Sequence, residues 1–148
     1  MQFTRVIPVL LLENNGLVKT VKFKNSRYIG DPINAMKIFN TKQVDELVIL
    51  DIMATRDKRE PDYDFINEIV SEAFMPIAYG GGVSKLEHIR RLFQLGVDKV
   101  IINSAAILQP DLIMQASAIY GNQSIIVALD IKKDFWGQNK LYSHLNSR

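Results

Sequence analysis

The stretch PIAYGGGVSKLEHIRRLFQLGVDKVIINSAA, residues 76–106, contains one complete structural repeat. An apolar run at 76–78 leads into three consecutive glycines, and a second apolar run occupies 100–102. Between them, Ser84 with Glu87 three residues later has the pattern of a capping box. Apolar residues then recur at helical spacing until Gly96, a residue type that commonly ends helices. We therefore expect a strand, a helix and a second, parallel strand.

The same alternation continues on both sides of this stretch. Further apolar runs lie at 6–12, 47–52 and 124–129, and amphipathic segments lie at 31–39, 65–73 and 110–121. Such runs are typical of strands buried on both faces of a parallel sheet. The pattern predicts an α/β fold of about five parallel strands and four helices in one domain, 1–148, with 131–148 as an irregular tail. A complete (βα)8 barrel needs roughly 200–250 residues, so 148 residues predict a half-barrel.

Composition narrows the classes of function. The chain has 18 basic and 16 acidic residues, which gives no reason to expect nucleic acid or a membrane as partner. Cysteine is absent, which excludes disulfides, thiolate metal sites and a cysteine nucleophile. No apolar run reaches the roughly 18 residues of a membrane span. The N-terminal stretch lacks a signal-peptide cleavage site, so we expect a cytoplasmic protein.

Glycines and polar residues follow the predicted strands at the end where parallel α/β sheets place functional groups. Gly80-Gly81-Gly82 precedes a predicted helix, whose free N–H groups suit a phosphate. Asn103 and Ser104 end the next strand and can donate hydrogen bonds to the same anion. A turn that merely requires positive φ explains the glycines equally well.

Charged residues stand at both ends of the predicted strands. Asp51 and Asp130 close the second and fifth strands, where a carboxylate can act as acid or base or orient a substrate hydroxyl. A helix cap or a salt bridge is an equal alternative. At the opposite ends, Arg5, Glu46 and Lys99 can pair with one another. Charges at that face of a barrel usually contribute to stability.

Residues 13–30 form a long polar insertion after the first strand, with Lys19 among its basic residues. Such a loop can be a lid or a phosphate contact at the functional rim, or simply a solvated loop. We expect both histidines, His88 and His144, to be exposed, and the aromatic pair at 135–136 to form exposed apolar surface.

Several segments together resemble the cyclase subunit of imidazole glycerol phosphate synthase, a (βα)8-barrel enzyme of histidine biosynthesis. The segments that carry the resemblance are RVIP at 5–8, GDP at 30–32, DELVILDI at 45–52, YGGGV at 79–83, GVDKVIINSAA at 96–106 and ALDIK at 128–132. The resemblance implies that ammonia from a glutaminase partner is added to a ribulosyl-formimino ribonucleotide, which closes the imidazole ring. It further implies an acid–base pair of aspartates, phosphate-binding loops, and a ring of four charged residues that gates the ammonia.

The resemblance assigns roles to individual residues. Asp130 matches the strand-five aspartate of the catalytic pair, and Asp98 matches a residue that faces the glutaminase. The substrate and phosphate contacts that we expect are Lys19, Asp51, Gly81, Gly82, Asn103 and Ser104, and the retained gate residues are Arg5, Glu46 and Lys99. No metal or organic cofactor is needed for these roles.

Two departures from the family pattern change the expected function. Leu11 stands where the family has its strand-one aspartate, and leucine cannot transfer a proton. Strands six to eight, with the second phosphate site and the fourth gate residue, are also missing from the sequence. The leucines at 10–12 and VKTVKFKN at 18–25 are similar to a paralogous branch linked to surface-polysaccharide biosynthesis. That branch is associated with a glutaminase and an N-acetyl sugar amidotransferase.

Three hypotheses follow. The first is a subunit that conducts ammonia to sugar amidation, and the second is a genuine histidine-pathway cyclase, against which Leu11 counts. The third is a truncated barrel that acts only as a binding piece or not at all. A half-barrel exposes strand edges and apolar faces, so we expect the isolated chain to self-associate.

Overall fold

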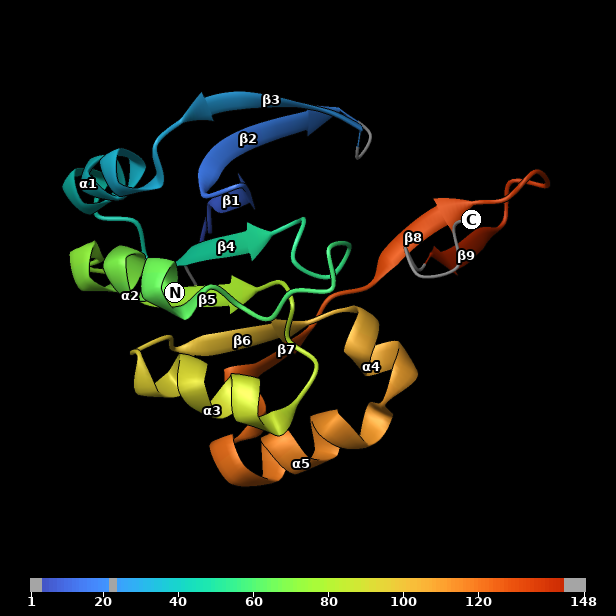
Figure 1. Ribbon diagram of the computed structural model, residues 1–148. Coiled ribbons are helices and arrows are strands. Elements are labelled where there is room, and N and C mark those ends of the chain that lie inside the picture. The colour runs from blue at the N-terminus through green and yellow to red at the C-terminus, as the bar shows by residue number, and fades with distance from the viewer. Residues whose placement is uncertain (1–3, 22–23, 143–148) are drawn as a thin grey trace.

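The structure, a computed structural model, describes residues 4–21 and 24–142. Five parallel strands form its centre (Figure 1). In spatial order they are β1 (Val9–Glu13), β4 (Leu47–Asp51), β5 (Ile77–Gly80), β6 (Lys99–Ile102) and β7 (Ile125–Val127). Each strand overlaps an apolar run of the sequence. The predicted α/β fold with five parallel strands is therefore confirmed.

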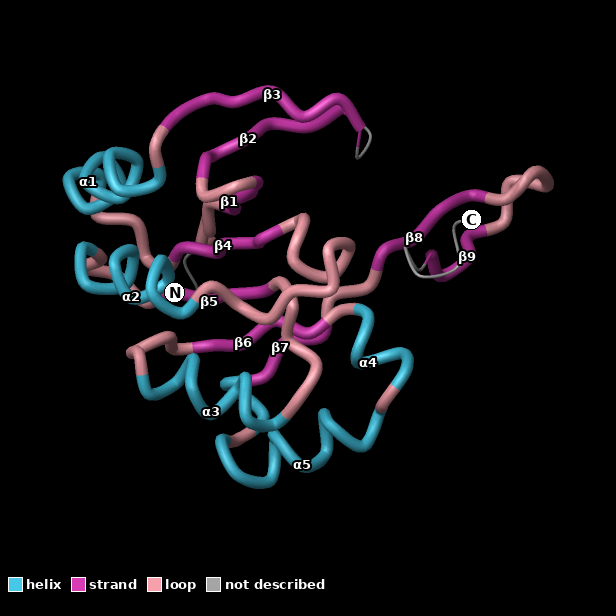
Figure 2. The backbone as a smooth tube through the Cα atoms, viewed as in Figure 1, coloured by secondary structure: helices cyan, strands magenta, loops and turns pink. Residues whose placement is uncertain are grey.

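Helices connect the parallel strands, and Figure 2 shows how helical and strand segments alternate between β4 and β7. The helices are α1 (Pro32–Lys42), α2 (Tyr63–Glu72), α3 (Leu86–Gln94), α4 (Ser104–Leu108) and α5 (Pro110–Tyr120), with a 3₁₀ turn at Asn122–Ser124. The sequence predicted four, because α4 has only 5 residues and is too short to show a periodic pattern. None of the helices in the described ranges is long and apolar enough to cross a membrane.

The helix starts show which capping signals work. Asp31 and Asp62 cap α1 and α2, since their carboxylates accept from the backbone N–H groups of Asn34 at 2.9 Å and Phe65 at 3.1 Å. The prediction of a capping box at Ser84 is wrong. Helix α3 begins two residues later, after Lys85, with no side-chain cap. Glu87 therefore lies in the first turn, where it binds Arg90 at 2.6 and 2.8 Å instead of reaching back.

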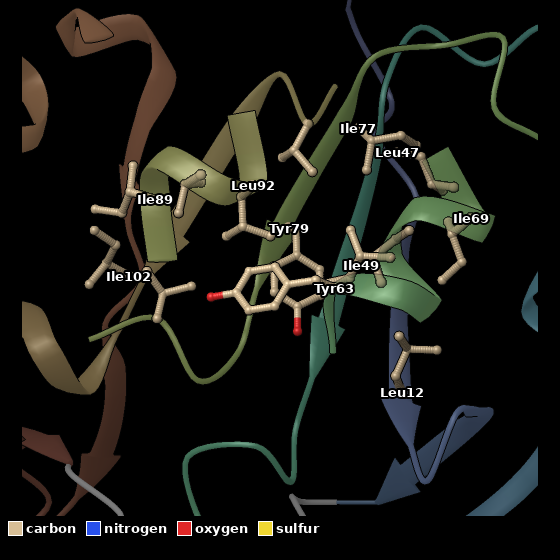
Figure 3. Packing of buried hydrophobic residues seen from close by; sticks show 14 of the residues in the cluster. Leu12, Leu47, Ile49, Tyr63, Ile69, Ile77, Tyr79, Ile89, Leu92 and Ile102 are labelled. Atoms are coloured by element: carbon tan, nitrogen blue, oxygen red, sulfur yellow. The ribbon is translucent and has the colours of Figure 1, made fainter. Parts of the chain in front are cut away.

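The core lies between one face of the sheet and the helices. Alternate residues of β4, β5 and β6 point into it and meet apolar side chains of α2 and α3. Figure 3 labels the strand residues Leu47, Ile49, Ile77, Tyr79 and Ile102 and the helix residues Ile69, Ile89 and Leu92. Val100 of β6 belongs to the same cluster. The residues between them point to the other face, because side chains alternate along a strand. We call this the open face; it includes Val9, Leu11, Val48, Leu50, Ala78, Lys99 and Ile101. Val9 is 54% exposed there.

The insertion at 13–30 is a hairpin, so the expectation of a loop is wrong. β2 (Gly16–Val21) pairs antiparallel with β1, and β3 (Lys24–Gly30) pairs with β2, which extends the sheet to the order β3-β2-β1-β4-β5-β6-β7. Asn14 and Asn15 have φ of 50° and 60°, as a two-residue turn requires. Leu17 and Val18 are buried, and their burial holds β2 in place.

The end of the described chain is also a hairpin. β8 (Asp130–Lys133) pairs antiparallel with β9 (Asn139–Tyr142), so the prediction of an irregular tail is wrong for these residues. The carboxylate Oδ1 of Asp134 accepts from the backbone N–H groups of Trp136 and Gln138, both at 2.9 Å, and closes the turn. Turns of this kind depend on one side chain rather than on periodicity. The remaining residues, including His144, lie outside the described ranges.

Candidate functional site

Three charged side chains meet at the N-terminal end of the parallel strands. Glu46 precedes β4 and is only 2% exposed. Its two carboxylate oxygens accept from Lys99 Nζ at 2.6 and 2.7 Å. Arg5 Nη2 adds a longer contact of 3.4 Å to Oε2. Residues that the sequence placed at one end of the sheet thus form a single ionic cluster.

The strands explain how the cluster forms. Glu46 alternates with Leu47 along the chain and therefore points to the open face. Lys99 lies on β6, two strands away, and the intervening strand places Ala78 in register with it. The small alanine side chain lets the lysine reach across. A carboxylate this deeply buried needs paired charges, and Lys99 and Arg5 supply them.

Asp98 lies at this same end of the sheet, directly before β6, and its side chain is exposed. Its carboxylate accepts from the backbone N–H of Ile77 at 2.9 Å, which ties β6 to β5. A cavity of about 250 Å³ opens beside it, lined in part by Phe74, which is 87% exposed. The residue therefore has a structural contact in the chain and also faces outward, where a partner can reach it.

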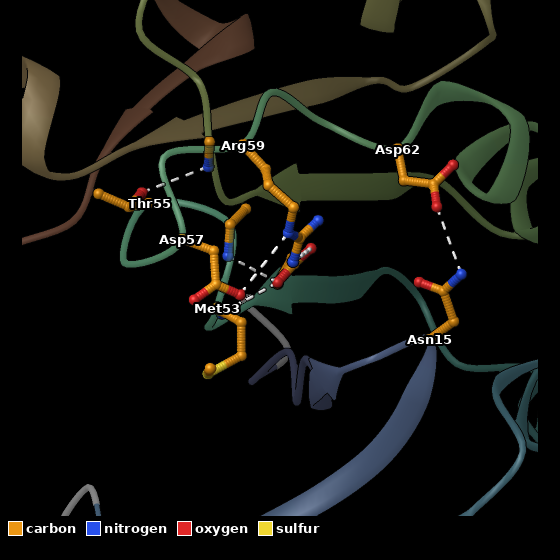
Figure 4. Close-up of polar contacts among 9 residues, drawn as sticks. Asn15, Met53, Thr55, Asp57, Arg59 and Asp62 are labelled. Atoms are coloured by element: carbon orange, nitrogen blue, oxygen red, sulfur yellow. Dashed lines mark hydrogen bonds and ion pairs between the residues drawn. The ribbon is translucent and has the colours of Figure 1, made fainter.

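At the opposite end, the glycine triplet packs against the segment that follows β4. A Cβ on Gly81 would lie 2.4 Å from the carbonyl oxygen of Asp51, and one on Gly82 would lie 2.5 Å from that of Arg59. Their φ angles, 123° and 69°, also favour glycine. Close backbone packing is thus sufficient reason for these glycines. The N–H of Gly82 lies 3.4 Å from the hydroxyl of Thr55 (Figure 4).

Asp51 organises the segment after β4. Its Oδ1 accepts from the N–H groups of Met53 at 2.9 Å and Ala54 at 3.0 Å, and its Oδ2 lies 3.4 Å from Arg59 Nη2 (Figure 4). Arg59 also lies 3.7 Å from Asp57. The side chain of Asp51 is only 9% exposed. The sequence left two interpretations of Asp51: a group that acts on a substrate, or a cap and salt bridge. These contacts match the second interpretation.

Asn103 and Asp130 are brought together, although 27 positions separate them. The amide Nδ2 of Asn103 donates to Asp130 Oδ2 at 2.9 Å. Asn103 precedes α4, which begins at Ser104, and Asp130 begins β8. Asn103, which was predicted to contact a phosphate, therefore lies directly beside Asp130, which was predicted to act as an acid or base. Lys19 lies elsewhere, exposed on the β2–β3 hairpin and in register with Arg27.

His88 is 7% exposed, so the expectation that it would be solvated is wrong. Its Nδ1 lies 3.2 Å from the carbonyl oxygen of Gly82, and the N–H of Ser84 points at the same nitrogen from 3.4 Å. The signal that could have placed it is its spacing, four residues before the buried Leu92. Within the part of the chain that the structure describes, no three acidic or histidine side chains group as metal ligands.

The open parallel sheet, with polar groups at its carboxyl ends and helices between its strands, is consistent with part of a (βα)8 barrel. Residues 5–146 match the model of the histidine biosynthesis protein family, and the chain belongs to that family. The resemblance seen in its sequence segments is thereby confirmed.

The similar proteins are synthase subunits by name. The chain is 52% identical over 144 residues to a Pseudomonas aeruginosa protein provisionally named imidazole glycerol phosphate synthase subunit hisF2, covering 97% of this chain and 57% of that one. It is 52% identical over 134 residues to a Vibrio vulnificus protein provisionally named subunit hisF3, covering 90% and 52%. With subunit HisF of Methanocaldococcus jannaschii it shares 38% over 137 residues, covering 93% and 50%. The chain thus spans about half the length of the curated relatives it matches.

Proposed function

We propose that the chain is the first half of a cyclase-type subunit of imidazole glycerol phosphate synthase that receives ammonia from a glutaminase and conducts it toward sugar amidation in polysaccharide biosynthesis. The observation that carries the proposal is the cluster of Glu46, Lys99 and Arg5 at one end of the open face, combined with Leu11 in β1. The cluster fits a gate, whereas leucine cannot serve as an acid or base.

The cluster has the properties that a gate for ammonia needs. Glu46 is fixed by burial, whereas the side chains of Lys99 and Arg5 are 30% and 56% exposed. Both are long and flexible, so they can swing outward while the carboxylate stays in place. Asp98, exposed at the same end, supports docking of the glutaminase on this side. Ammonia would then enter the open face between the two cationic side chains.

The other end of the strands fits a phosphorylated small molecule. Gly81 and Gly82 lie in the loop after β5, and Asn103 and Ser104 lie between β6 and the first turn of α4, which supports a phosphate there. Lys19 is exposed on the β2–β3 hairpin, where it can reach an anion. Asp130 is oriented by Asn103 and can hold a substrate hydroxyl.

A histidine-pathway cyclase is the second candidate, and the contact between Asn103 and Asp130 favours it. That contact keeps one carboxylate of the family's acid–base pair in a defined place. General acid–base catalysis typically contributes about 10²–10⁴-fold. With Leu11 in place of the other carboxylate, we expect ring closure to be slow by roughly that factor.

Isotope transfer separates the candidates. The native-length protein would be combined with the glutaminase of the same organism, with glutamine labelled in its amide nitrogen, and with either an N-acetyl sugar and its amidotransferase or the cyclase substrate. Label in the sugar supports ammonia conduction, and label in imidazole glycerol phosphate supports the cyclase. Label in neither product, with active glutaminase, supports the inactive barrel fragment. Glu46→Gln should uncouple glutamine hydrolysis from labelling in either active case.

A further inference from the structure

The turn between β1 and β2 contains the single Asn-Gly step of the sequence, Asn15-Gly16. Gly16 begins β2 and is paired with Glu13 at the end of β1. Asn15 is exposed, and its φ of 60° lies in the left-handed region that a two-residue turn requires. Its amide nitrogen Nδ2 donates to Asp62 Oδ2 at 3.3 Å (Figure 4). This contact links the turn to the residue that precedes α2.

Asp62 has two hydrogen-bonding roles. Its Oδ1 accepts from the backbone N–H of Phe65 at 3.1 Å and caps α2, whereas its Oδ2 accepts from Asn15. If an oxygen replaced Nδ2, the donor would become a second carboxylate that faces the first one. Two carboxylates at this separation repel each other. The contact between the turn and α2 therefore depends on one nitrogen atom, and deamidation of Asn15 removes that atom.

The chemistry of an Asn-Gly step is specific to its two residues. Asparagine is a thermolabile residue type, and glycine has no side chain to hinder its own backbone nitrogen. That nitrogen of Gly16 forms a bond to Cγ of Asn15, and the bond from Cγ to Nδ2 breaks. Nδ2 leaves as ammonia and takes the proton that the backbone nitrogen loses. Water then opens the cyclic imide at either carbonyl, which gives an aspartate or an isoaspartyl linkage.

The fold controls how often this reaction can begin. In a two-residue turn, the residue after the turn commonly donates its N–H to the carbonyl of the residue before it. The pairing of Glu13 with Gly16 has this register, so the nitrogen of Gly16 can react only when this end of the ladder opens. A side chain at position 16 would hinder the reaction, but its Cβ would lie 2.9 Å from Tyr28 Cε2. The packing of Tyr28 therefore favours the glycine and so retains the reactive step.

We propose that Asn15 is a site of spontaneous deamidation, and that its conversion releases the β1–β2 turn from α2. A brief opening of the ladder exposes the nitrogen of Gly16, and the reaction replaces a donor with a carboxylate. The new charge opposes the return of the turn to Asp62. An isoaspartyl linkage also adds one carbon to the backbone of the turn, which the pairing of Glu13 with Gly16 does not accommodate. The inference does not depend on the proposed function.

Incubation of the folded protein at 37 °C and pH 8, followed by peptide mass mapping, tests the site. We expect Asn15 to show the mass gain of an NH2 group replaced by OH before Asn25 and Asn139 do. Those two residues also lie in hairpins, but serine and lysine follow them. Asn15→Gln is the control, because glutamine keeps an amide but would need a larger ring. Earlier reaction at Asn25 or Asn139, or no reaction at Asn15 in a folded protein whose urea-unfolded chain reacts, would overturn the proposal.

Amide hydrogen exchange tests the release of the turn. Asn15→Asp introduces the carboxylate directly, and it should speed the exchange of the Leu17 and Val18 amides several-fold. Adding Asp62→Asn places an amide opposite that carboxylate, and asparagine is as good a helix cap as aspartate. The double variant should therefore return the exchange to the native rate, with Asp62→Asn alone as the control for effects on α2. Unchanged exchange in Asn15→Asp, or no rescue in the double variant, would show that the proposed release is wrong.

Discussion

Glu46 and Lys99 are 53 positions apart in the sequence and meet across an intervening strand, with Nζ 2.6 Å from Oε1 and 2.7 Å from Oε2. The contact needs three conditions at once. Both residues must point to the open face, the strand between them must carry a small side chain, and Glu46 must be shielded from water. Ala78 is the small side chain on the strand between them. Glu46 is shielded from water, since only 2% of it is exposed.

Glu46→Gln should lower the free energy of unfolding by roughly 1–3 kcal/mol, because Lys99 and Arg5 lose a charged acceptor. The loss should stay below that of a fully buried pair, since both cations can still reach water. Urea unfolding at pH 7 measures it. Glu87→Gln is the control, because its pair with Arg90 is exposed and should leave the midpoint unchanged. Equal effects of both substitutions would contradict a special role for the buried cluster.

Leu11→Asp, introduced into the native-length protein, should raise ring closure by up to about 10²–10⁴-fold if only the acid–base group is missing. The side chain is half-buried on the open face, in register with Leu50, so the carboxylate is placed beside the substrate end of the strands. Leu11→Asn is the control, as it is equally polar but transfers no proton. No gain with Asp would mean that substrate recognition has diverged as well.

Gly82→Ala should destabilise the protein by about 2–4 kcal/mol, because it combines backbone strain with a clash. Gly82 has φ of 69°, and its Cβ would lie 2.5 Å from the carbonyl oxygen of Arg59. Gly137→Ala separates the two causes, since Gly137 has φ of 78° but open space around it. Gly137→Ala should therefore lower the free energy of unfolding only by the backbone strain, about 1 kcal/mol. Thermal unfolding of both variants provides the comparison.

Tyr79 should make the fold sensitive to alkali. Burial, and then the charge of Asp51, raise the pKa of the Tyr79 phenol well above its ordinary value of 10.0. The unfolded chain ionises near pH 10 while the folded one does not, so this stabilisation is complete below about pH 10 and falls as pH rises further. Unfolding in urea at pH 8 and pH 11 should show less loss for Tyr79→Phe than for the native protein. Tyr28→Phe, at a side chain that is 66% exposed, should leave the loss unchanged.

The isolated 148-residue chain should self-associate at micromolar concentration through its open face. Val9→Lys places a charge on that face, and it should shift sedimentation velocity toward the monomer. Trp136→Ser removes a different exposed apolar group, 82% exposed, and should not. If only the tryptophan variant dissociates, the hairpin is the interface. A clean monomer for the native chain would show that the prediction is wrong.

The parallel strands could be predicted because a strand covered on both faces must be apolar throughout. The run at 47–52 has that composition and became β4. The β2–β3 hairpin could not be predicted this way, because β3 is exposed along almost its whole length. The pair Asn14-Asn15 is a signal only for the turn from β1 into β2, and it suits a tight turn but occurs in many loops.

Contacts within the candidate site could be predicted where they depend only on how far along its strand each residue lies. Arg5, Glu46 and Lys99 meet because Lys99 begins β6 and the other two lie shortly before the starts of β1 and β4. The contact between Asn103 and Asp130 depends on how the chain turns after β7, which no periodic pattern encodes. His88 was misplaced because the segment that covers it, near Glu60, belongs to a different repeat.

The turn at Asp134 has a practical consequence for experiments on this protein. Trp136 is the single tryptophan of the sequence, and the turn holds it outward at the tip of the β8–β9 hairpin. Its fluorescence therefore reports on solvent and contacts at the hairpin, whereas the interior is sensed by tyrosines such as Tyr63 and Tyr79. A molecule that binds near the hairpin should change tryptophan emission while leaving the tyrosine signal of the folded core untouched. The two emissions thus provide separate optical readouts of binding and of unfolding.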